Sequence, residues 1–185
     1  MPRDNHTRKG LSQVVSALIL LVVAVLLAAA VTYYATNITM SRTTMEEVLF
    51  SKEHIWCNET GSVAGFKLQN VGGRDILIDK IAIRGVEQTW SDVYFYRVPS
   101  DTLITADVNV TNPVGLTGSW VEIDGRNYTQ AISDIPLQSG CELIVYVKDP
   151  PNIQPRDVGK SVNLMVVTNN SEYITECNVE SLTQQ

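Results

Sequence analysis

The residues that could carry chemistry gather at the amino terminus, where a short polar leader meets a long apolar run. Residues 1–10 hold Arg3, Arg8 and Lys9 and end in Gly10, and Leu11-Ser12-Gln13 follows. From Val14 to Val31 every residue is apolar except Ser16, and no charged residue lies between Lys9 and Arg42. The junction is therefore a candidate protease substrate. A cut between Gly10 and Leu11 removes the basic leader and leaves the apolar segment on the mature chain.

An ordinary secretory signal has a different layout. Its apolar stretch is about 7–15 residues long and is removed by a cut on the far side, after small residues. Here the apolar run is 18 residues long, which is enough to cross a bilayer as a helix. Because the positive residues precede this span, the carboxyl-terminal part is expected outside the cytoplasm.

The chain after Gly10 has few of the residues that enzymes use for catalysis. After Gly10 the only histidine is His54, so neither a Ser-His-Asp triad nor a multi-histidine metal centre is expected. The carboxylate pairs Asp75/Asp79 and Asp101/Asp107 flank expected turns, and nothing selects them as acid and base. No glycine-rich phosphate loop is present. We expect no enzyme, no cofactor and no metal.

The charge balance narrows the class of partner. The chain has a formal net charge of -6. Without the leader, 11 Lys and Arg face 19 Asp and Glu, a formal charge of -8. Binding to a nucleic-acid backbone needs a basic patch, so no nucleic acid is expected as a partner.

Three cysteines, Cys57, Cys141 and Cys177, lack the Cys-x-x-Cys spacing of metal or redox motifs. Outside the cytoplasm they suggest one disulfide and one remaining thiol. We place Cys57 by a turn that feeds one strand and Cys141 at the start of another strand running the same way, with Cys177 at the opposite pole. A Cys57–Cys141 disulfide is therefore expected, and three buried free thiols are the alternative.

Two kinds of element must position these residues. No Gly or Pro occurs from Leu11 through Ser51, and a helical stripe continues beyond the apolar run through Tyr34, Ile38, Met45, Val48 and Leu49. We expect a cleaved leader at residues 1–10, one long helix at 11–52 and a globular domain at 53–185.

The globular part has the pattern of short strands. Expected turns lie at Asp124-Gly125 and at Asn169-Asn170-Ser171. The expected strands cover residues 66–69, 76–83, 104–110, 120–123, 127–132, 143–147, 162–168 and 173–179. The predicted fold class is α+β: a long N-terminal hydrophobic α-helix followed by an all-β, immunoglobulin-like sandwich.

The amino terminus carries a resemblance to a known family. Lys9-Gly10 followed by LSQVVSALILLVVAVLLAAAVTYYA resembles archaeal type IV prepilins with a class III signal peptide, in detail over residues 8–35. The segment LQNVGGRDILIDKIAIRG resembles the "NVG" strand–turn–strand of archaeal surface and pilin domains. Bacterial type IV pilins carry Glu at the fifth position after the cut, whereas this chain has Val15. Adhesive pilus and archaellum subunits both fit the resemblance.

The resemblance implies a function and a set of partners. A prepilin peptidase would cut after Gly10, and membrane assembly machinery would move the helix from the inner (cytoplasmic) membrane, where the precursor is stored, into an extracellular helical filament at the cell surface. The partners are then further copies of the chain. Small and apolar residues would pack the helices together in the filament core: Ala17, Leu21, Ala24 and Ala28.

Two further expectations concern the exported surface. Asn-x-Ser/Thr sequons are N-glycosylation candidates, and in the mature chain they start at Asn37, Asn58, Asn109, Asn127 and Asn169. The alternative function is a single-pass, membrane-anchored binding or adhesion module. The aromatic segment Val86–Pro136, which holds Trp90, Tyr94, Phe95, Tyr96 and Trp120, supports that alternative.

Overall fold

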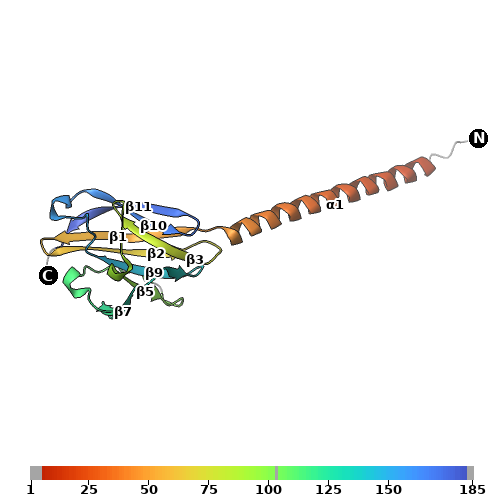
Figure 1. Cartoon of the computed structure of the whole chain (residues 1–185). Helices are drawn as coiled ribbons and strands as arrows, with labels where there is room; N and C mark the ends of the chain where they lie inside the picture. Colours follow the sequence, from red (N-terminus) through yellow and green to blue (C-terminus); the bar gives the residue numbers. More distant parts are fainter. Residues whose placement is uncertain (1–5, 103, 183–185) are drawn as a thin grey trace, which may run out of the picture. The chain divides into compact units, whose positions relative to one another are not determined.

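A computed structural model describes residues 6–102 and 104–182, with side chains from Ser12 onward. The chain divides into two compact units near Thr44, one helical and one built of strands (Figure 1). The expected α+β class is confirmed.

The helical unit is a single helix, α1 (His6–Thr44), of 39 residues. Its stretch from Val14 to Val31 consists of Val, Leu, Ala and Ile, with Ser16 as the single polar residue. Its second part is rich in threonine, and the hydroxyls of Thr32, Thr36 and Thr39 each donate to the carbonyl four residues earlier, at 2.8–2.9 Å. These bonds satisfy the hydroxyls along the helix itself. The helix therefore continues through Thr36–Thr44, although the β-branched residues there disfavour a helix.

The helix ends earlier than expected. It stops at Thr44 rather than near Ser51, and strand β1 begins at Val48. The boundary expected at residue 52 is therefore wrong. Residues 45–47 are held on a turn of the β domain: the amides of Val71 and Gly72 donate to the Glu47 carbonyl and that of Gly73 donates to Met45. These tertiary bonds outweigh the helical stripe that the sequence shows at Met45, Val48 and Leu49.

The second unit contains eleven strands in one mixed sheet, in the order β4-β3-β10-β11-β1-β2-β9-β5-β7-β6, with β8 paired to β3. Three short 3-10 helices lie in its loops, at Trp90–Asp92, Pro113–Gly115 and Pro155–Asp157. The strands are β1 (Val48–Asn58), β2 (Gly61–Asn70), β3 (Ile76–Ile83), β4 (Val86–Glu87), β5 (Val93–Val98), β6 (Trp120–Ile123), β7 (Arg126–Gln130), β8 (Ile135–Leu137), β9 (Glu142–Lys148), β10 (Ser161–Thr168) and β11 (Glu172–Ser181).

The sheet curls so that two layers face each other. Strands β3, β10 and β11 form one layer, and β1, β2, β9 and β5 form the other, with a common core between them that includes Phe66, Ile81 and Val166, all 0% exposed. The two layers are joined by the parallel pair β1–β11, in which Ile55 lies opposite Val179. This parallel pair, which makes the sheet mixed, distinguishes the domain from an immunoglobulin-like sandwich of two antiparallel sheets.

A second core lies on the opposite face of β1, β2 and β9. It contains Trp56, Val63, Tyr94 and Tyr146, and a segment without strand structure covers it, contributing Ile104, Val108 and Leu116. We call residues 104–119 the covering segment. The strand expected at 104–110 is therefore wrong: its alternation places Ile104 and Val108 against the sheet, but no neighbouring strand pairs with it.

The Asn70-Val71-Gly72 turn explains the "NVG" pattern physically. The Asn70 side chain is fully buried; its amide donates to the carbonyls of Arg74 and Leu137 at 2.8 and 3.1 Å, and its oxygen accepts from the Gly72 amide. A Cβ on Gly72 would lie 2.6 Å from the Met45 carbonyl oxygen. Glycine is thus required for the chain to pass this closely.

Most of the other expected elements are confirmed. Strands β3, β9, β10 and β11 cover the expected apolar runs, and the Asn169–Ser171 turn joins the last two. Asp124 and Gly125, with φ of 54° and 71°, form the two-residue turn between β6 and β7, as a type I′ hairpin requires.

The expected Cys57–Cys141 disulfide is wrong. Cys57 lies opposite Ser62 on β2, whereas the Cys141 carbonyl accepts from the amide of Asn70, at the other end of the same strand. Eight residues of strand correspond to about 26 Å, far beyond the Cα spacing of roughly 4.4–6.8 Å that a disulfide spans. Cys57 does lie beside the turn that leads into β2, and Cys141 directly precedes β9, but β2 and β9 run antiparallel rather than in the same direction.

All three cysteines are free thiols, Cys57 and Cys177 buried and Cys141 partly exposed. Burial, with the nearby charges of Glu180 and Glu53, raises the pKa of Cys177 to about 12. Burial also raises the pKa of Cys57, with Asp157 and Asp149 adding to the effect. The two buried cysteines are therefore poor nucleophiles in the folded protein.

These environments predict a labelling pattern. Iodoacetamide should modify the folded chain once, at Cys141, and the unfolded chain three times, as read from intact mass and peptide mapping. Cys141→Ser is the matched control and should take no label while folded. An unfolded, unreduced chain that takes a single label would contradict the assignment of three free thiols.

Candidate functional site

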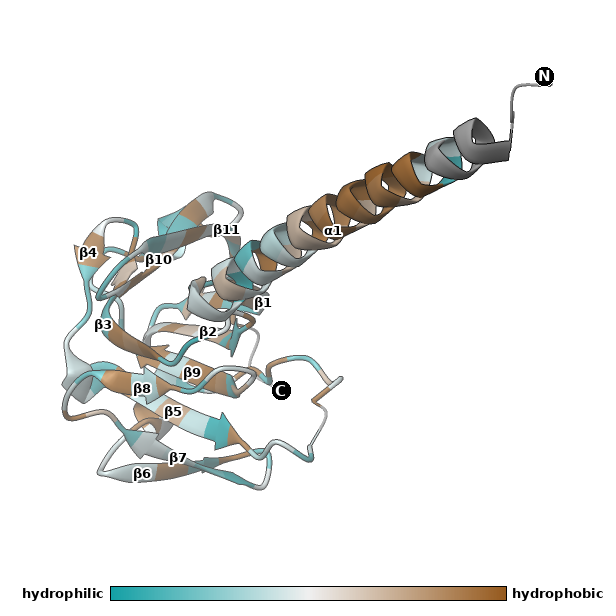
Figure 2. Ribbon diagram, turned by 90° about the vertical axis from the view of Figure 1, so that its right-hand side faces the viewer, coloured by the Kyte–Doolittle hydropathy of each residue, from teal (hydrophilic) through white to brown (hydrophobic). Residues whose placement is uncertain are grey.

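The apolar part of α1 is exposed along its whole length. Every residue from Val14 to Val31 is exposed, and Figure 2 shows this stretch as the continuous hydrophobic part of the helix. The helix is long and apolar enough to cross a membrane. At about 1.5 kcal/mol or more for each large side chain, leaving twelve such Val, Leu and Ile side chains in water costs on the order of 20 kcal/mol.

The four residues expected to pack helices together lie on one side of α1. Ala17, Leu21, Ala24 and Ala28 follow one another at intervals of four, three and four residues, which places them along one stripe. All four are exposed. The junction residues Lys9, Gly10 and Leu11 are helical, within α1, and their side chains lie outside the described part of the structure.

The sequons are spread over both units. Asn37 is exposed on α1, and Asn109, Asn127 and Asn169 are exposed on the β domain. Asn58 differs, because its side-chain oxygen accepts hydrogen bonds from the Thr60 amide and hydroxyl and from the Gly61 amide at 2.7–3.1 Å. Its side chain is thus engaged in the turn between β1 and β2.

The polar groups that converge most closely in the β domain lie where β1 meets the covering segment. In β1 a bulge separates Ser51, opposite Lys67, from His54, opposite Gly65. Lys52, within the bulge, has a φ of 59°, a left-handed conformation that costs a non-glycine residue about 1–2 kcal/mol. Its ammonium group donates to the carbonyl of Ile104 at 3.2 Å and to that of Ala106.

His54 lies between two carboxylates. Its Nδ1 is 3.0 Å from Glu180 on β11, and its Nε2 is 3.1 Å from Asp107 in the covering segment. The imidazole stacks on the Trp56 ring, with centroids 5.2 Å apart and planes 5° apart. Partial burial lowers the pKa of His54, but the hydrogen bonds and charges of Glu180 and Asp107 outweigh it, and the pKa is raised above its usual 6.5.

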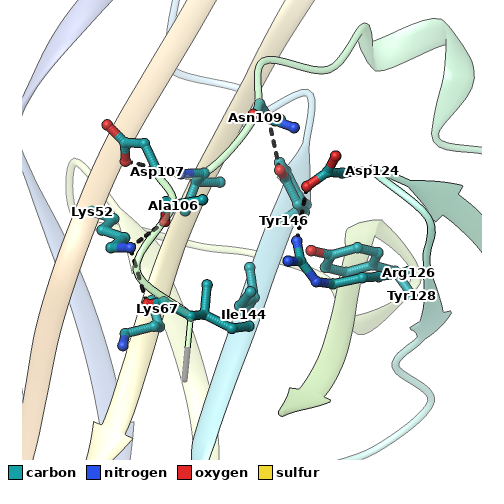
Figure 3. A pocket seen from close by; sticks show the side chains of 12 residues that line it. Lys52, Lys67, Ala106, Asp107, Asn109, Asp124, Arg126, Tyr128, Ile144 and Tyr146 are labelled. Atoms are coloured by element: carbon teal, nitrogen blue, oxygen red, sulfur yellow. Dashed lines mark hydrogen bonds and ion pairs between the residues drawn. The ribbon is translucent and has the colours of Figure 1, made fainter. Parts of the chain in front are cut away.

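Two tyrosines hold the rest of the covering segment. The Tyr146 hydroxyl donates to the Asn109 carbonyl at 2.7 Å, and the Tyr94 hydroxyl donates to the Gly118 carbonyl at 3.1 Å. Burial raises the pKa of Tyr146, so its phenol remains a donor. Figure 3 shows Tyr146 pointing to Asn109 and Lys52 pointing to Ala106.

Lys52, Asp107 and Tyr146 are among the residues that line a cavity of about 10 Å³, which is room for about one water molecule. The cavity is therefore too small for an organic substrate. Within the described residues no group of three or more His, Cys, Asp and Glu side chains is placed to hold a metal ion. The Asp107–Asn109 stretch instead caps the second core.

The covering segment packs directly over Gly65 on β2. A Cβ at this position would lie 2.9 Å from Cγ1 of Val108, 3.0 Å from the Trp56 ring and 3.0 Å from the Tyr146 ring. Gly65 pairs with His54 on β1 and with Tyr146 on β9. The absence of a side chain here creates the depression that Val108 fills.

Sequence reasoning missed this cluster. It considered His54 only as a catalytic or metal-binding residue and assigned no role to Lys52, Gly65 or Tyr146. The sequence of β1 does contain a sign of the bulge, because the alternation of its core-facing residues changes register. Val48 and Phe50 face the first core before the bulge, and Ile55 and Cys57 face it after the bulge. An odd step in a strand pattern indicates an extra residue.

The chain matches no protein-family model, and no curated protein matches its sequence.

The fit at Gly65 yields a prediction. Gly65→Ala should destabilise the protein by about 1–3 kcal/mol, the usual cost of overpacking a filled site, because Val108 must move off the sheet. The measurement is urea unfolding of the full chain in detergent, followed by tryptophan fluorescence. Gly115→Ala is the matched control, since nothing lies within 4 Å of a Cβ there. Equal losses in both variants would contradict the role of Gly65.

Proposed function

We propose that the chain is a structural subunit of an extracellular helical filament of the type IV pilus class, which polymerises through α1 after cleavage between Gly10 and Leu11. The observation that carries the proposal is the exposed apolar run of an unusually long helix. Its cost in water, on the order of 20 kcal/mol, exceeds the net stability of a typical domain. This surface must therefore be covered by lipid or by other helices.

The length of α1 favours a filament over a plain anchor. The part of α1 that remains after cleavage, residues 11–44, makes a rod of about 51 Å, while the hydrocarbon core of a bilayer is only about 30 Å thick. The remaining part, from Thr32 onward, is polar but still helical. A membrane anchor does not require this extension, whereas in a filament core built of overlapping helices the extension can contact neighbouring subunits. The resemblance of residues 8–35 to archaeal type IV prepilins points the same way.

Cleavage and assembly can then be described in physical terms. While the leader is attached, Arg3, Arg8 and Lys9 keep the amino terminus in the cytoplasm, because moving these charges through hydrocarbon is costly. A prepilin peptidase removes them, and assembly machinery transfers the helix from the membrane to a bundle of identical helices. Lipid and helices are about equally apolar, so close packing of small residues drives the exchange. Contacts that repeat without closing produce a helical fibre.

A membrane-anchored surface binding module is the second candidate. One observation favours it: apolar side chains remain exposed around β6 and β7, including Trp120 at 60% and Ile132 at 91%. Of the aromatic residues in the segment 86–136, Tyr94 is buried and Phe95 and Tyr96 are half-buried. The two functions share the membrane precursor and differ in whether the leader is removed and the helices assemble.

The processing step gives the first test of the proposal. The intact mass of the exported protein should begin at Leu11, and Gly10→Trp should block processing and leave the chain in the membrane fraction. Thr7→Val, also in the leader, is the matched control and should be processed normally. Exported protein that retains Met1–Gly10, or filaments of normal number from the Gly10→Trp variant, would exclude the filament function.

The packing stripe gives a second test, which separates filament from anchor. Ala24→Leu combined with Ala28→Leu keeps the helix apolar, so membrane insertion and leader removal should be unchanged, while the larger side chains separate the helices and filament number falls strongly. Leu20→Ile is the control that adds no volume. The measurement is filament counting by electron microscopy beside membrane fractionation. Normal filaments from the double variant would show that this face is not the packing face.

A further inference from the structure

The geometry around His54 carries an inference that does not depend on the filament function. A neutral imidazole has one N–H donor and one acceptor nitrogen. Both ring nitrogens of His54 face carboxylate oxygens, at 3.0 Å from Glu180 and 3.1 Å from Asp107, and an ionised carboxylate only accepts. Both contacts are therefore satisfied only when the ring is protonated. In the neutral ring one nitrogen lone pair must face a carboxylate.

We propose that His54 is a pH-sensitive latch: its protonated ring bridges Glu180 on β11 and Asp107, holding Asp107 and Val108 of the covering segment against the sheet, and loss of the proton releases these two residues. The charged groups around the ring are Lys52 and Glu53 on β1, Asp107 in the covering segment and Glu180 on β11. Gly65, its partner on β2, adds no charge.

Several neighbours favour the protonated form. The ring stacks on Trp56, and a cation gains energy over an indole face. The pKa of His54 is raised. At Asp107, partial desolvation is outweighed by the hydrogen bonds from the Val108 amide and His54 and by the charges of His54 and Lys52, so its pKa is lowered. The latch thus closes above the lowered pKa of Asp107 and opens as the pH rises through the raised pKa of His54.

Release should be confined to Asp107 and Val108. The contacts of Lys52 with the carbonyls of Ile104 and Ala106, of Tyr146 with Asn109 and of Tyr94 with Gly118 do not involve His54, so the residues on either side stay attached. Val108 is the residue that moves. Its methyl group lies in the depression at Gly65 between the rings of Trp56 and Tyr146, and opening uncovers that apolar surface.

The test uses nuclear magnetic resonance of the full chain in detergent, from about pH 5 to about pH 9, a range that brackets histidine titration. The His54 ring and the Val108 methyl groups are observed together, with His54→Gln identifying the signal of His54 beside that of His6. In the wild type, the Val108 methyl shifts, displaced by the two aromatic rings, should move toward unstructured values with the same midpoint as the His54 ring. The methyl groups of exposed Val110 should not follow.

Variants separate the latch from an incidental surface contact. In His54→Gln the Val108 shifts should not depend on pH. Asp107→Asn and Glu180→Gln should each move the His54 midpoint to lower pH, while Asp101→Asn, which changes a carboxylate outside this cluster, should leave it unchanged. Asp107→Asn keeps an acceptor for the Val108 amide and serves if His54→Gln does not fold. The proposal is overturned if Val108 stays in place while His54 titrates, or if neither carboxylate variant moves the midpoint.

Discussion

The double pairing of β1 is the constraint on which the rest of the β domain depends. This strand runs antiparallel to β2 and parallel to β11, and so it joins the two layers that enclose the first core. Its bulge at Lys52 changes which residues face that core, from Val48 and Phe50 to Ile55 and Cys57. The same shift directs His54 and Trp56 to the opposite face. One extra residue in one strand thus serves both cores.

The second core follows from the burial of β2 and β9 on both faces. A strand with apolar residues on both sides needs a cover on each, and here one side is covered by a further layer of strands and the other by residues 104–119. This segment has no strand partner, so its carbonyl groups require other donors. Lys52, Tyr146 and Tyr94 supply them to Ile104, Asn109 and Gly118. Polar side chains on the sheet thus replace some of the missing ladder bonds.

The parts that could be predicted from the sequence are those in which local pattern and tertiary structure agree. The apolar run of α1, the Asp124-Gly125 hairpin and the continuous apolar stretch of β9 belong to this group. The wrong predictions lie where contacts between residues far apart in the sequence determine the local structure. The turn at 71–73 captures residues 45–47 and ends the helix before the stripe at Val48 and Leu49 is used. At 104–110 the alternating apolar pattern misled, because Ile104 and Val108 are buried while Ala106 and Val110 are exposed and no neighbouring strand pairs with the segment. The site around His54 needed β1 and β11 in register, and no local pattern contains that register.

The two units differ in how far each buries its own apolar side chains. Both cores of the β domain are formed by residues 48–182, so the side chains of these cores are buried within the domain itself. The apolar run of α1 has no such cover among the described residues. The energy available for association is therefore concentrated in the helix, whichever environment covers it. In the filament that we propose, α1 would pass from lipid to a bundle of helices while the β domain keeps the same packing, because the transfer changes the surroundings of α1 without requiring any strand pair to break.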